Sequence, residues 1–354
     1  MITIEKALGD PALLGAGLGN LATWANWCAV LKGAFGIQLS RKERRAFEVV
    51  AQRAPPTKRV GELWCILGRR SGKSRIAAAL AVFFALFIPH QLAAGEVGTV
   101  LVLAASKAQA NVVFRYCQGL IESSPVLRQE LVSATATELR LRNGVIIGVH
   151  PASFRTVRGR TILACIFDEV AYWRDEYSAS PDIEIHRAVL PSLATTGGML
   201  IGISTPYRKA GLLHGKFRDS FGVDDPSVLV IRGDSKTFNP LLDDRIIEQA
   251  TAADPEAADS EWGGNFRTDL AALLDDALIE DAIDYSRPLE LPPQLGFKYK
   301  AFLDPSGGRH DSFSIAIAHR ESDRLIVDVV RGRKPPFDPH QVTAEFVALA
   351  AEYG

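Results

Sequence analysis

The segment at residues 67–74 reads Leu-Gly-Arg-Arg-Ser-Gly-Lys-Ser, and it lies between two apolar runs, residues 63–67 and 76–87. The first run predicts a buried strand and the second a helix, so the segment is a glycine-rich turn from strand to helix. In such a turn, backbone N–H groups and a helix N-terminus converge on one point and can bind a polyphosphate. We therefore predict a P-loop, with Lys73 at the outer phosphates and the Ser74 hydroxyl on Mg²⁺.

The spacing of the glycines departs from the usual P-loop pattern. That pattern places its first glycine five residues before Gly72, where this chain has Leu67, and the glycine follows one position later. The alternative is a chance glycine-rich turn, but Gly-Lys-Ser lies at the strand-to-helix junction that the motif requires. The residues that we expect to bind the phosphates are Gly68, Arg69, Arg70, Ser71, Gly72, Lys73 and Ser74.

The composition is that of an ordinary globular chain, with 354 residues, 47% hydrophobic and 23% charged. The formal net charge is −1, so any contact with nucleic acid has to come from local basic patches. The four cysteines are scattered and form no CxxC pair, which favours buried thiols over zinc ligands or disulfides. The longest apolar stretch, residues 76–88, is shorter than the ~20 residues that span a bilayer, so we expect no membrane partner.

Sequence patterns divide the chain into four parts. Residues 1–60 form an N-terminal helical segment, and residues 61–235 alternate strands and helices. Continuous apolar runs in the second part predict an α/β fold, a parallel sheet with helices on both faces. Residues 236–296 form an acidic, helical linking region, and residues 297–354 begin a new domain with three strands and a helix. The main strands expected are residues 63–67, 100–105, 161–167, 199–203, 299–303, 313–319 and 324–330.

A second chemical signature follows the predicted strand at residues 161–167. Asp168 and Glu169 come directly after the apolar run, at the carboxyl edge where open α/β sheets bind ligands. A strand-end aspartate holds Mg²⁺ in P-loop NTPases, so we assign that role to Asp168. Glu169 is then left to orient the attacking water and take its proton. The alternative is that Asp168 only caps the following helix, which the P-loop upstream disfavours.

Further candidates surround the outer phosphate. Ser204 and Thr205 follow the predicted strand at residues 199–203, where their hydroxyls can couple the state of the nucleotide to movement. The alternative is a plain cap between strand and turn. Arginine stabilises the charge of a transferred phosphoryl group, an effect of ~10³–10⁵ in rate. The candidates are Arg69, Arg70, Arg155, Arg158 and Arg160, with DNA phosphate contact or plain solvation as alternatives for the last three.

The last domain contains a candidate metal site. Asp304 follows the apolar strand at residues 299–303, and Asp311 lies beyond a Gly-Gly turn. Two carboxylates at the mouth of a hairpin can hold the divalent ions that two-metal phosphodiester cleavage requires. By itself Asp-Pro-Ser-Gly-Gly is an ordinary turn, so this prediction depends on the motifs upstream.

The order of these motifs resembles the large terminase subunit of tailed bacteriophages. That family joins a P-loop ATPase of the additional-strand, catalytic-glutamate (ASCE) type to a ribonuclease H-like nuclease. Residues 68–74 are similar to its variant loop, and residues 167–172 to its segment with the Mg²⁺ ligand and the catalytic glutamate. Gln38 is a loose match to its adenine-contacting segment. Asp304 falls where its first nuclease ligand belongs, and Asp311 where a second acid often occurs.

The resemblance implies an ATP- and Mg²⁺-dependent motor subunit that moves double-stranded viral DNA into a procapsid. It implies a homo-oligomeric ring, with a portal protein and a small terminase subunit as partners, in the cytoplasm of a bacterial host. Lys73 and Glu169 would be catalytic, with Arg70 or Arg158 at the transition state, and Mg²⁺ or Mn²⁺ would occupy the nuclease site. Because the family's nuclease takes further carboxylates from strands beyond the first three, we expect DNA cleavage by this chain to be absent or badly impaired.

Three other functions stay open from the sequence. One is a helicase or another nucleic-acid translocase with the same ATPase core. A second is a degenerate prophage protein that binds nucleotide without turnover. The third is a nuclease that acts alone.

Overall fold

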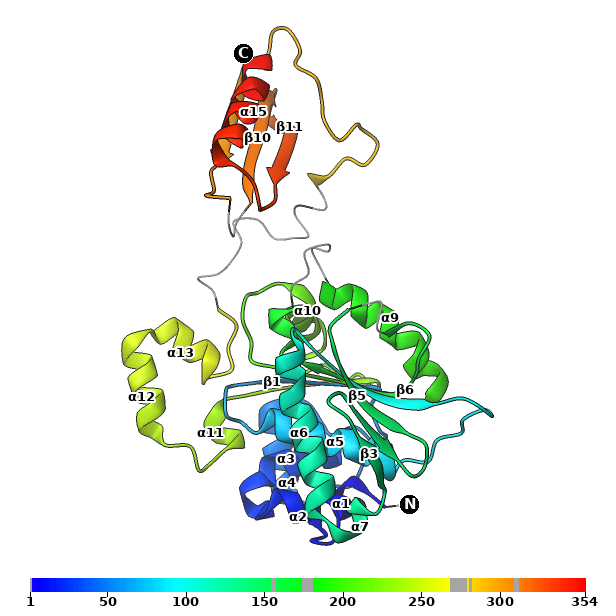
Figure 1. Cartoon of the computed structure of the whole chain (residues 1–354). Helices are drawn as coiled ribbons and strands as arrows, with labels where there is room; N and C mark the ends of the chain where they lie inside the picture. Colours follow the sequence, from blue (N-terminus) through cyan, green and yellow to red (C-terminus); the bar gives the residue numbers. More distant parts are fainter. Residues whose placement is uncertain (1, 154–156, 174–180, 268–278, 280–281, 309–311) are drawn as a thin grey trace. The chain divides into compact units, whose positions relative to one another are not determined.

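The chain forms two compact units, Met1–Asp275 and Asp276–Gly354, in the computed structural model of Figure 1. The residues that the structure describes are 2–153, 157–173, 181–267, 279, 282–308 and 312–354. Two candidates from the sequence, Arg155 and Asp311, lie outside this part of the chain. The division into four parts stays a prediction.

The larger unit is built on a sheet that has eight strands within the described residues, in the order β3-β4-β5-β2-β6-β7-β1-β8. The strands are β1 Glu62–Leu67, β2 Gly98–Ala104, β3 Leu131–Ala134, β4 Glu138–Leu141, β5 Ile146–Pro151, β6 Thr161–Asp168, β7 Met199–Ser204 and β8 Val228–Gly233. All pairs from β5 to β8 in this order are parallel, and β3 and β4 add an antiparallel edge. The predicted α/β fold with a mostly parallel sheet is confirmed.

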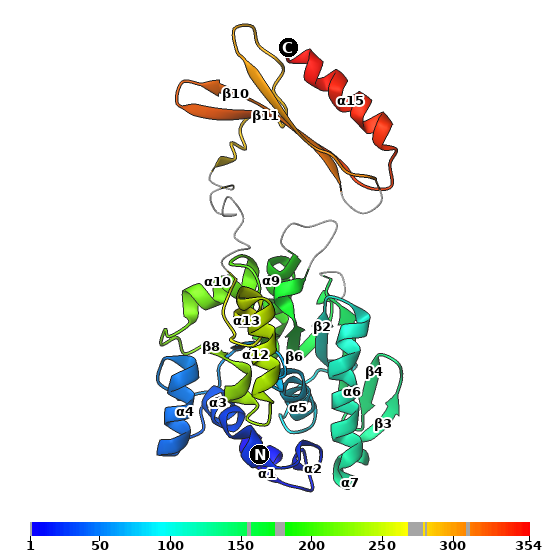
Figure 2. The same cartoon turned by 90° about the vertical axis from the view of Figure 1, so that its left-hand side faces the viewer.

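Helices cover both faces of this sheet (Figures 1 and 2). The helices described in the larger unit are α1 Ile4–Gly9, α2 Gly15–Leu18, α3 Ala25–Ala34, α4 Arg41–Ala51, α5 Lys73–Leu86, α6 Lys107–Ser123, α7 Pro125–Arg128, α9 Pro181–Thr196, α10 Gly211–Ser220, α11 Ser235–Phe238, α12 Asp244–Ala253 and α13 Pro255–Glu261. Throughout the described ranges, each helix is too short or too polar to cross a membrane.

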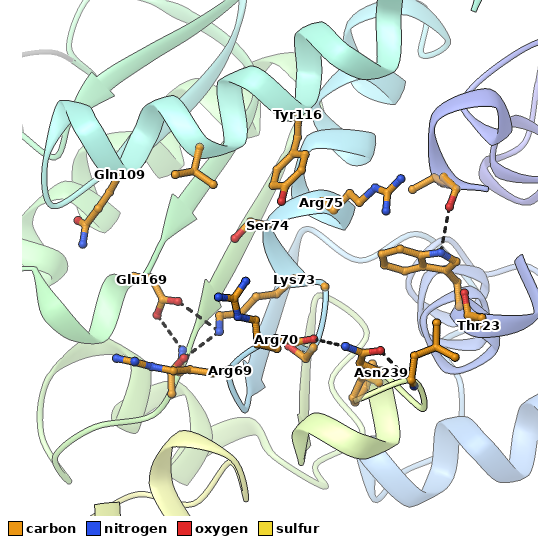
Figure 3. Close-up of a pocket in the computed structure, with 18 of the residues that line it drawn as sticks. Thr23, Arg69, Arg70, Lys73, Ser74, Arg75, Gln109, Tyr116, Glu169 and Asn239 are labelled. Carbon is orange, nitrogen blue, oxygen red and sulfur yellow. Dashed lines mark hydrogen bonds and ion pairs between the residues drawn. The ribbon is translucent and has the colours of Figure 1, made fainter. Parts of the chain in front are cut away.

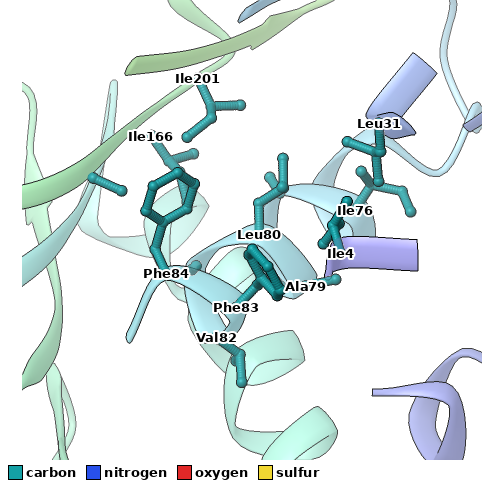
Figure 4. Packing of buried hydrophobic residues seen from close by; sticks show 14 of the residues in the cluster. Ile4, Leu31, Ile76, Ala79, Leu80, Val82, Phe83, Phe84, Ile166 and Ile201 are labelled. Carbon is teal, nitrogen blue, oxygen red and sulfur yellow. The ribbon is translucent and has the colours of Figure 1, made fainter. Parts of the chain in front are cut away.

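Alternate residues of β1 enter two separate cores. Leu63 and Cys65 pack with α5 and the N-terminal helices, whereas Trp64 and Ile66 pack with α9 and α10. Helix α5 is apolar on all sides because it lies inside the first core, where Figure 4 shows its Leu80, Phe83 and Phe84. Burial of both faces explains why the central strands are continuous apolar runs.

A buried charged cluster lies at the start of β1, at the opposite end of the strand from the P-loop. Glu62 Oε2 lies 2.7 Å from Lys216 Nζ of α10 and 3.3 Å from His186 Nε2 of α9, and it accepts a hydrogen bond from Trp64 Nε1 at 2.7 Å. Burial raises the pKa of Glu62, but the hydrogen bonds and the Lys216 charge outweigh burial and hold that pKa at about 2. The cluster therefore favours the folded state wherever Glu62 is ionised.

We expect Glu62→Gln to lower the free energy of unfolding by about 3 kcal/mol at pH 7. A carboxylate whose pKa is depressed on folding contributes stability above its unfolded pKa, so the difference should shrink as the pH falls from about 4.5 to about 2. Urea unfolding at pH 7 and pH 3 measures both effects. The control is Glu48→Gln, which removes an exposed carboxylate 3.7 Å from Arg44 and should leave stability nearly unchanged. A loss of equal size at both pH values would contradict the electrostatic explanation.

The smaller unit is an antiparallel sheet, in the order β11-β10-β9 within the described residues, with a helix on one face (Figure 2). Its elements are β9 Tyr299–Asp304, β10 Phe313–Glu321, β11 Arg324–Arg333 and α15 Pro339–Glu352. Phe313, Ile315 and Ile317 alternate along β10 and pack against Val342 and Phe346 of α15. The three predicted strands and the helix are confirmed, while the ribonuclease H-like assignment stays a prediction.

Candidate nucleotide-binding site

The P-loop connects the end of β1 at Leu67 to the start of α5 at Lys73. Two of its positions require glycine. A Cβ at Gly68 would collide with Ser235 Oγ and with the carbonyl oxygen of Trp262. At Gly72, which has a φ of +83°, a Cβ would lie 2.7 Å from the ring of Trp24. Packing thus explains the glycine at position 68, one residue later than in the usual P-loop pattern, because the loop passes close to the chain after β8 at this point.

Hydrogen bonds from distant segments hold the carbonyl groups of the loop. Trp27 Nε1, on α3, donates to the carbonyl oxygen of Ser71 at 2.8 Å. Asn239 Nδ2, which follows α11, donates to the carbonyl oxygen of Arg70 at 2.9 Å. The conformation of the P-loop therefore depends on the N-terminal helices and on the linking region as well as on its own sequence.

The strands β6, β7 and β1 are neighbours in the sheet, so their carboxyl ends bring three motifs together. Lys73 Nζ lies 3.2 Å from Glu169 Oε1 and donates to Thr205 Oγ1 at 2.8 Å (Figure 3). Glu169 Oε2 accepts hydrogen bonds from Thr205 N at 2.9 Å and from Ser204 Oγ at 3.3 Å. The structure thus places four of the predicted residues in direct contact. Their chemical roles stay predictions.

Asp168 ends β6 with only 4% of its surface exposed. Its Oδ1 has no hydrogen-bond partner among the described residues, and Trp173 Nε1 donates to its backbone carbonyl instead. Burial raises the pKa of Asp168 to about 7, with a further rise from the Glu169 carboxylate and an opposing effect of Lys73. A buried carboxylate oxygen without a partner is costly unless a proton or a cation accompanies it, so this oxygen is suited to a metal ion.

The residues present could hold Mg²⁺ only if a nucleotide supplied further ligands. Asp168 and Ser74 offer a carboxylate and a hydroxyl, and Mg²⁺ typically takes one or two such protein ligands and completes its shell with phosphate oxygens and water. Across the described residues, no group of three or more His, Cys, Asp or Glu side chains forms a metal site on its own. The donor set is therefore that of a metal–nucleotide site.

A cavity of about 910 Å³ opens beside these residues, within the size range of small-molecule sites (Figure 3). Part of its lining comes from the P-loop and from the segments that follow β6 and β7: Arg69, Arg70, Ser71, Gly72, Lys73, Ser74, Glu169 and Thr205. The other lining residues are Leu18, Asn20, Thr23, Trp24, Arg75, Gln109, Val112, Tyr116, Tyr172, Phe238, Asn239 and Leu241. The first set is polar and the second contains several aromatic rings, so the cavity offers groups suited to phosphates and rings suited to a planar base.

The lining of this cavity differs from the prediction for the adenine contact. Gln38 is exposed and is not among the residues that line the cavity, and Phe35 of the same segment packs against Phe83 in the core. The adenine contact of Gln38 therefore stays a prediction without support from the geometry. Trp24 and Tyr116 line the cavity instead, and no sequence signal distinguishes either from an ordinary aromatic residue.

The arginine candidates separate into two groups. Arg69 and Arg70 line the cavity, and Arg69 Nη2 lies 3.2 Å from Glu261 Oε1 of α13. Arg158 and Arg160 are not among the residues that line it. Of the arginine candidates that the structure describes, Arg69 and Arg70 line the cavity, and both belong to the P-loop.

The structure describes one of the two predicted nuclease ligands. Asp304 is exposed at the end of β9, and Asp311 lies outside the described residues. Among the acids that the structure describes in the smaller unit, Asp328 is buried, and its Oδ2 lies 2.7 Å from His319 Nδ1. A nuclease metal site at Asp304 and Asp311 stays a prediction.

No family model matches the chain, and the search of curated proteins found no match. Solved structures do match. The large terminase of bacteriophage HK97 has 19% identity and a TM-score of 0.47, covering 78% of this chain and 60% of its own. The large terminase ATPase domain of Thermus phage P74-26 has 19% identity and a TM-score of 0.46, covering 67% of this chain and 97% of its own. A large terminase from a thermophilic bacteriophage, in complex with ADP, has 12% identity and a TM-score of 0.47, covering 82% of this chain and 68% of its own.

All three are large terminase structures. They come from the family that the sequence motifs resemble. At these identities and TM-scores, the fold and the site stand on this chain's own elements and contacts.

Proposed function

We propose that the chain is an ATP-hydrolysing motor subunit of the large terminase type, which moves double-stranded viral DNA into a procapsid. The observation that supports the ATPase is the contact of Lys73 with Glu169 and Thr205 in the wall of the cavity, beside Asp168, whose Oδ1 has no hydrogen-bond partner among the described residues. The DNA-packaging part is supported by the order of the sequence motifs and by their resemblance to that family.

In this mechanism the triphosphate lies on the N–H groups of the P-loop, at the N-terminus of α5. The Lys73 ammonium group leaves Glu169 and contacts the outer phosphates. Glu169 is then able to accept a proton from water. Ser74 and Asp168 would hold Mg²⁺, which neutralises developing phosphate charge when bound. Arg69 or Arg70 stabilises the transition state from within the loop.

Thr205 is suited to couple the nucleotide state to movement. Its hydroxyl accepts from Lys73 and its backbone N–H donates to Glu169, so a change in either contact acts directly on the chain after β7. Ser204 joins the same network through its hydroxyl, which donates to Glu169 Oε2. The coupling role of both residues belongs to this proposal.

The remaining parts of the proposal depend on the resemblance. They are an endonuclease that uses Mg²⁺ or Mn²⁺ at Asp304 and Asp311, a ring of identical subunits, a portal protein and a small terminase subunit as partners, and action at the procapsid in the bacterial cytoplasm.

An ATPase assay with and without duplex DNA tests the proposal. We expect Mg²⁺-dependent turnover that duplex DNA stimulates, and we expect the stimulation to fall steeply between about 50 and about 200 mM salt, because the contacts are to phosphates. ATP turnover that duplex DNA does not change would contradict the motor function and leave an ATPase. Nucleotide binding without turnover would favour the degenerate protein, and strand separation would favour the helicase.

A further inference from the structure

Contacts with the first turn of α5 restrain the ring of Trp24 beside the P-loop. Trp24 ends the 3₁₀ helix η1, Leu21–Trp24, and lines the cavity. Its Nε1 donates to the carbonyl oxygen of Leu18 at 3.3 Å, and the guanidinium carbon of Arg75 lies over the ring, 5.5 Å from its centroid. Arg75 also donates to the carbonyl oxygen of Gly17, in the same segment. The indole therefore presents a prearranged aromatic surface in the wall of the cavity.

Trp24 and Glu169 lie beside different residues of the P-loop. The Trp24 ring is close to Gly72, whereas Lys73 contacts Glu169. Figure 3 shows Glu169 on one side of Lys73 and Thr23, the neighbour of Trp24, on the other. A triphosphate whose outer phosphate lies at Lys73 and Glu169 therefore has its base on the side of Thr23 and Trp24, because the base is at the opposite end of the nucleotide.

The polar side chains on this side of the cavity already form hydrogen bonds within the protein. Asn20 Oδ1 accepts from the backbone N–H two residues on at 3.0 Å, and Thr23 Oγ1 donates to the carbonyl oxygen of Asn20 at 2.8 Å. Asn239 Nδ2 donates to the carbonyl oxygen of Arg70 at 2.9 Å, and its Oδ1 accepts from a backbone N–H at 3.3 Å. These side chains stabilise turns and the P-loop, so stacking is the main contact that this part of the cavity offers to a base.

We propose that the base of the nucleotide stacks on Trp24, and that the site takes purine nucleoside triphosphates as a class, without a strong preference for adenine over guanine. This inference rests on the proposed nucleotide-hydrolysing function and names the substrates of that site. Every base has a flat face that can stack on an aromatic ring, and the fused rings of a purine cover more of an indole than a single pyrimidine ring does. Strong discrimination between two bases requires hydrogen bonds to their edges, which can reject the wrong group by about 10⁴-fold.

Equilibrium binding to the full chain and to its Trp24→Ala variant, with Mg²⁺ present, tests the stacking contact. We expect Trp24→Ala to weaken the binding of ATP and of GTP about tenfold or more, because it removes the aromatic surface. The probe without a base is inorganic tripolyphosphate, whose binding should not change. Tyr116→Ala is the matched control, since it removes another aromatic ring of the cavity and should leave all three affinities nearly unchanged.

A comparison of four nucleotides tests the substrate class. On the unmodified chain, ATP and GTP should bind within about threefold of each other, and CTP and UTP about fivefold more weakly. In Trp24→Ala the difference between purines and pyrimidines should largely disappear. A preference for ATP over GTP of more than about tenfold would overturn the substrate class, because it would require hydrogen bonds to the edge of the base. Equal binding of all four nucleotides would overturn it too.

Tripolyphosphate separates the failure of this inference from the failure of the proposed function. If the unmodified chain binds neither tripolyphosphate nor any nucleotide, the proposed function fails and this inference with it. If Trp24→Ala binds ATP as tightly as the unmodified chain does, or loses tripolyphosphate as well, only the stacking contact is overturned. Circular dichroism checks that the variants are folded. If Trp24→Ala fails to fold, Trp24→Leu replaces it, because leucine keeps apolar bulk beside Gly72 and lacks the aromatic face.

Discussion

The Glu169→Gln variant should bind ATP with nearly unchanged affinity and hydrolyse it about 10²–10⁴ times more slowly. Glutamine keeps the size of the side chain and an oxygen that can accept the hydrogen bond from Thr205 N, which measures 2.9 Å to Glu169 Oε2. It cannot take a proton from water. Single-turnover hydrolysis and equilibrium binding of ATP, measured on the same preparation, separate these two effects.

The control for this experiment is Glu184→Gln, an exposed position on α9 that should change neither quantity. Unchanged hydrolysis in Glu169→Gln would mean that another residue takes the proton from the attacking water. Loss of ATP binding would mean that Glu169 acts mainly by positioning Lys73, whose ammonium lies 3.2 Å away.

The Asp168→Asn variant should gain stability and lose activity. Without nucleotide, Asp168 is 4% exposed and its Oδ1 lacks a partner within the described chain, so an ionised carboxylate there is costly. We expect the variant to be more stable than the unmodified chain by about 1–3 kcal/mol at pH 8, where the carboxyl is ionised. Its Mg²⁺-dependent hydrolysis should fall at least about 10²-fold, because a neutral amide is a poor Mg²⁺ ligand.

Urea unfolding with a chelator present measures the first effect, and ATP turnover against Mg²⁺ concentration measures the second. The matched control is Asp182→Asn on α9. Asp182 is similarly buried, but its Oδ2 accepts from Leu212 N at 2.6 Å and its Oδ1 accepts from Ile183 N at 2.9 Å. That variant should lose stability, because it leaves one N–H without its acceptor. If Asp168→Asn also loses stability, the lone carboxylate has a structural role instead.

The P-loop part of the site could be predicted from the sequence because it follows local rules. A glycine-rich turn before a helix binds phosphates, and polar residues after buried strands collect at one edge of a parallel sheet. These two rules bring Lys73, Glu169 and Thr205 together without knowledge of the strand order. In the structure Lys73 contacts the side chains of Glu169 and Thr205, and the backbone N–H of Thr205 donates to Glu169.

The aromatic lining of the cavity could not be predicted because it depends on packing between distant segments. Trp24 reaches the cavity from the N-terminal helices, Tyr116 from α6 and Asn239 from the linking region. Nothing in a local pattern tells which aromatic residue of a helix faces a cavity. The strand β8 could not be predicted either. Its residues, Val228–Gly233, are too few for periodicity to distinguish a strand from a helix.

The hydrogen bonds that hold the P-loop have a practical consequence for dissecting this protein. Trp27 and Asn239 hold the carbonyl groups of Ser71 and Arg70, and the N–H group of Arg69 donates to the carbonyl of Glu261. An excised core of residues 61–235 would retain the whole glycine-rich motif and lose all three of these supports. The smallest expressible fragment with an intact site should therefore extend from the first helices through α13.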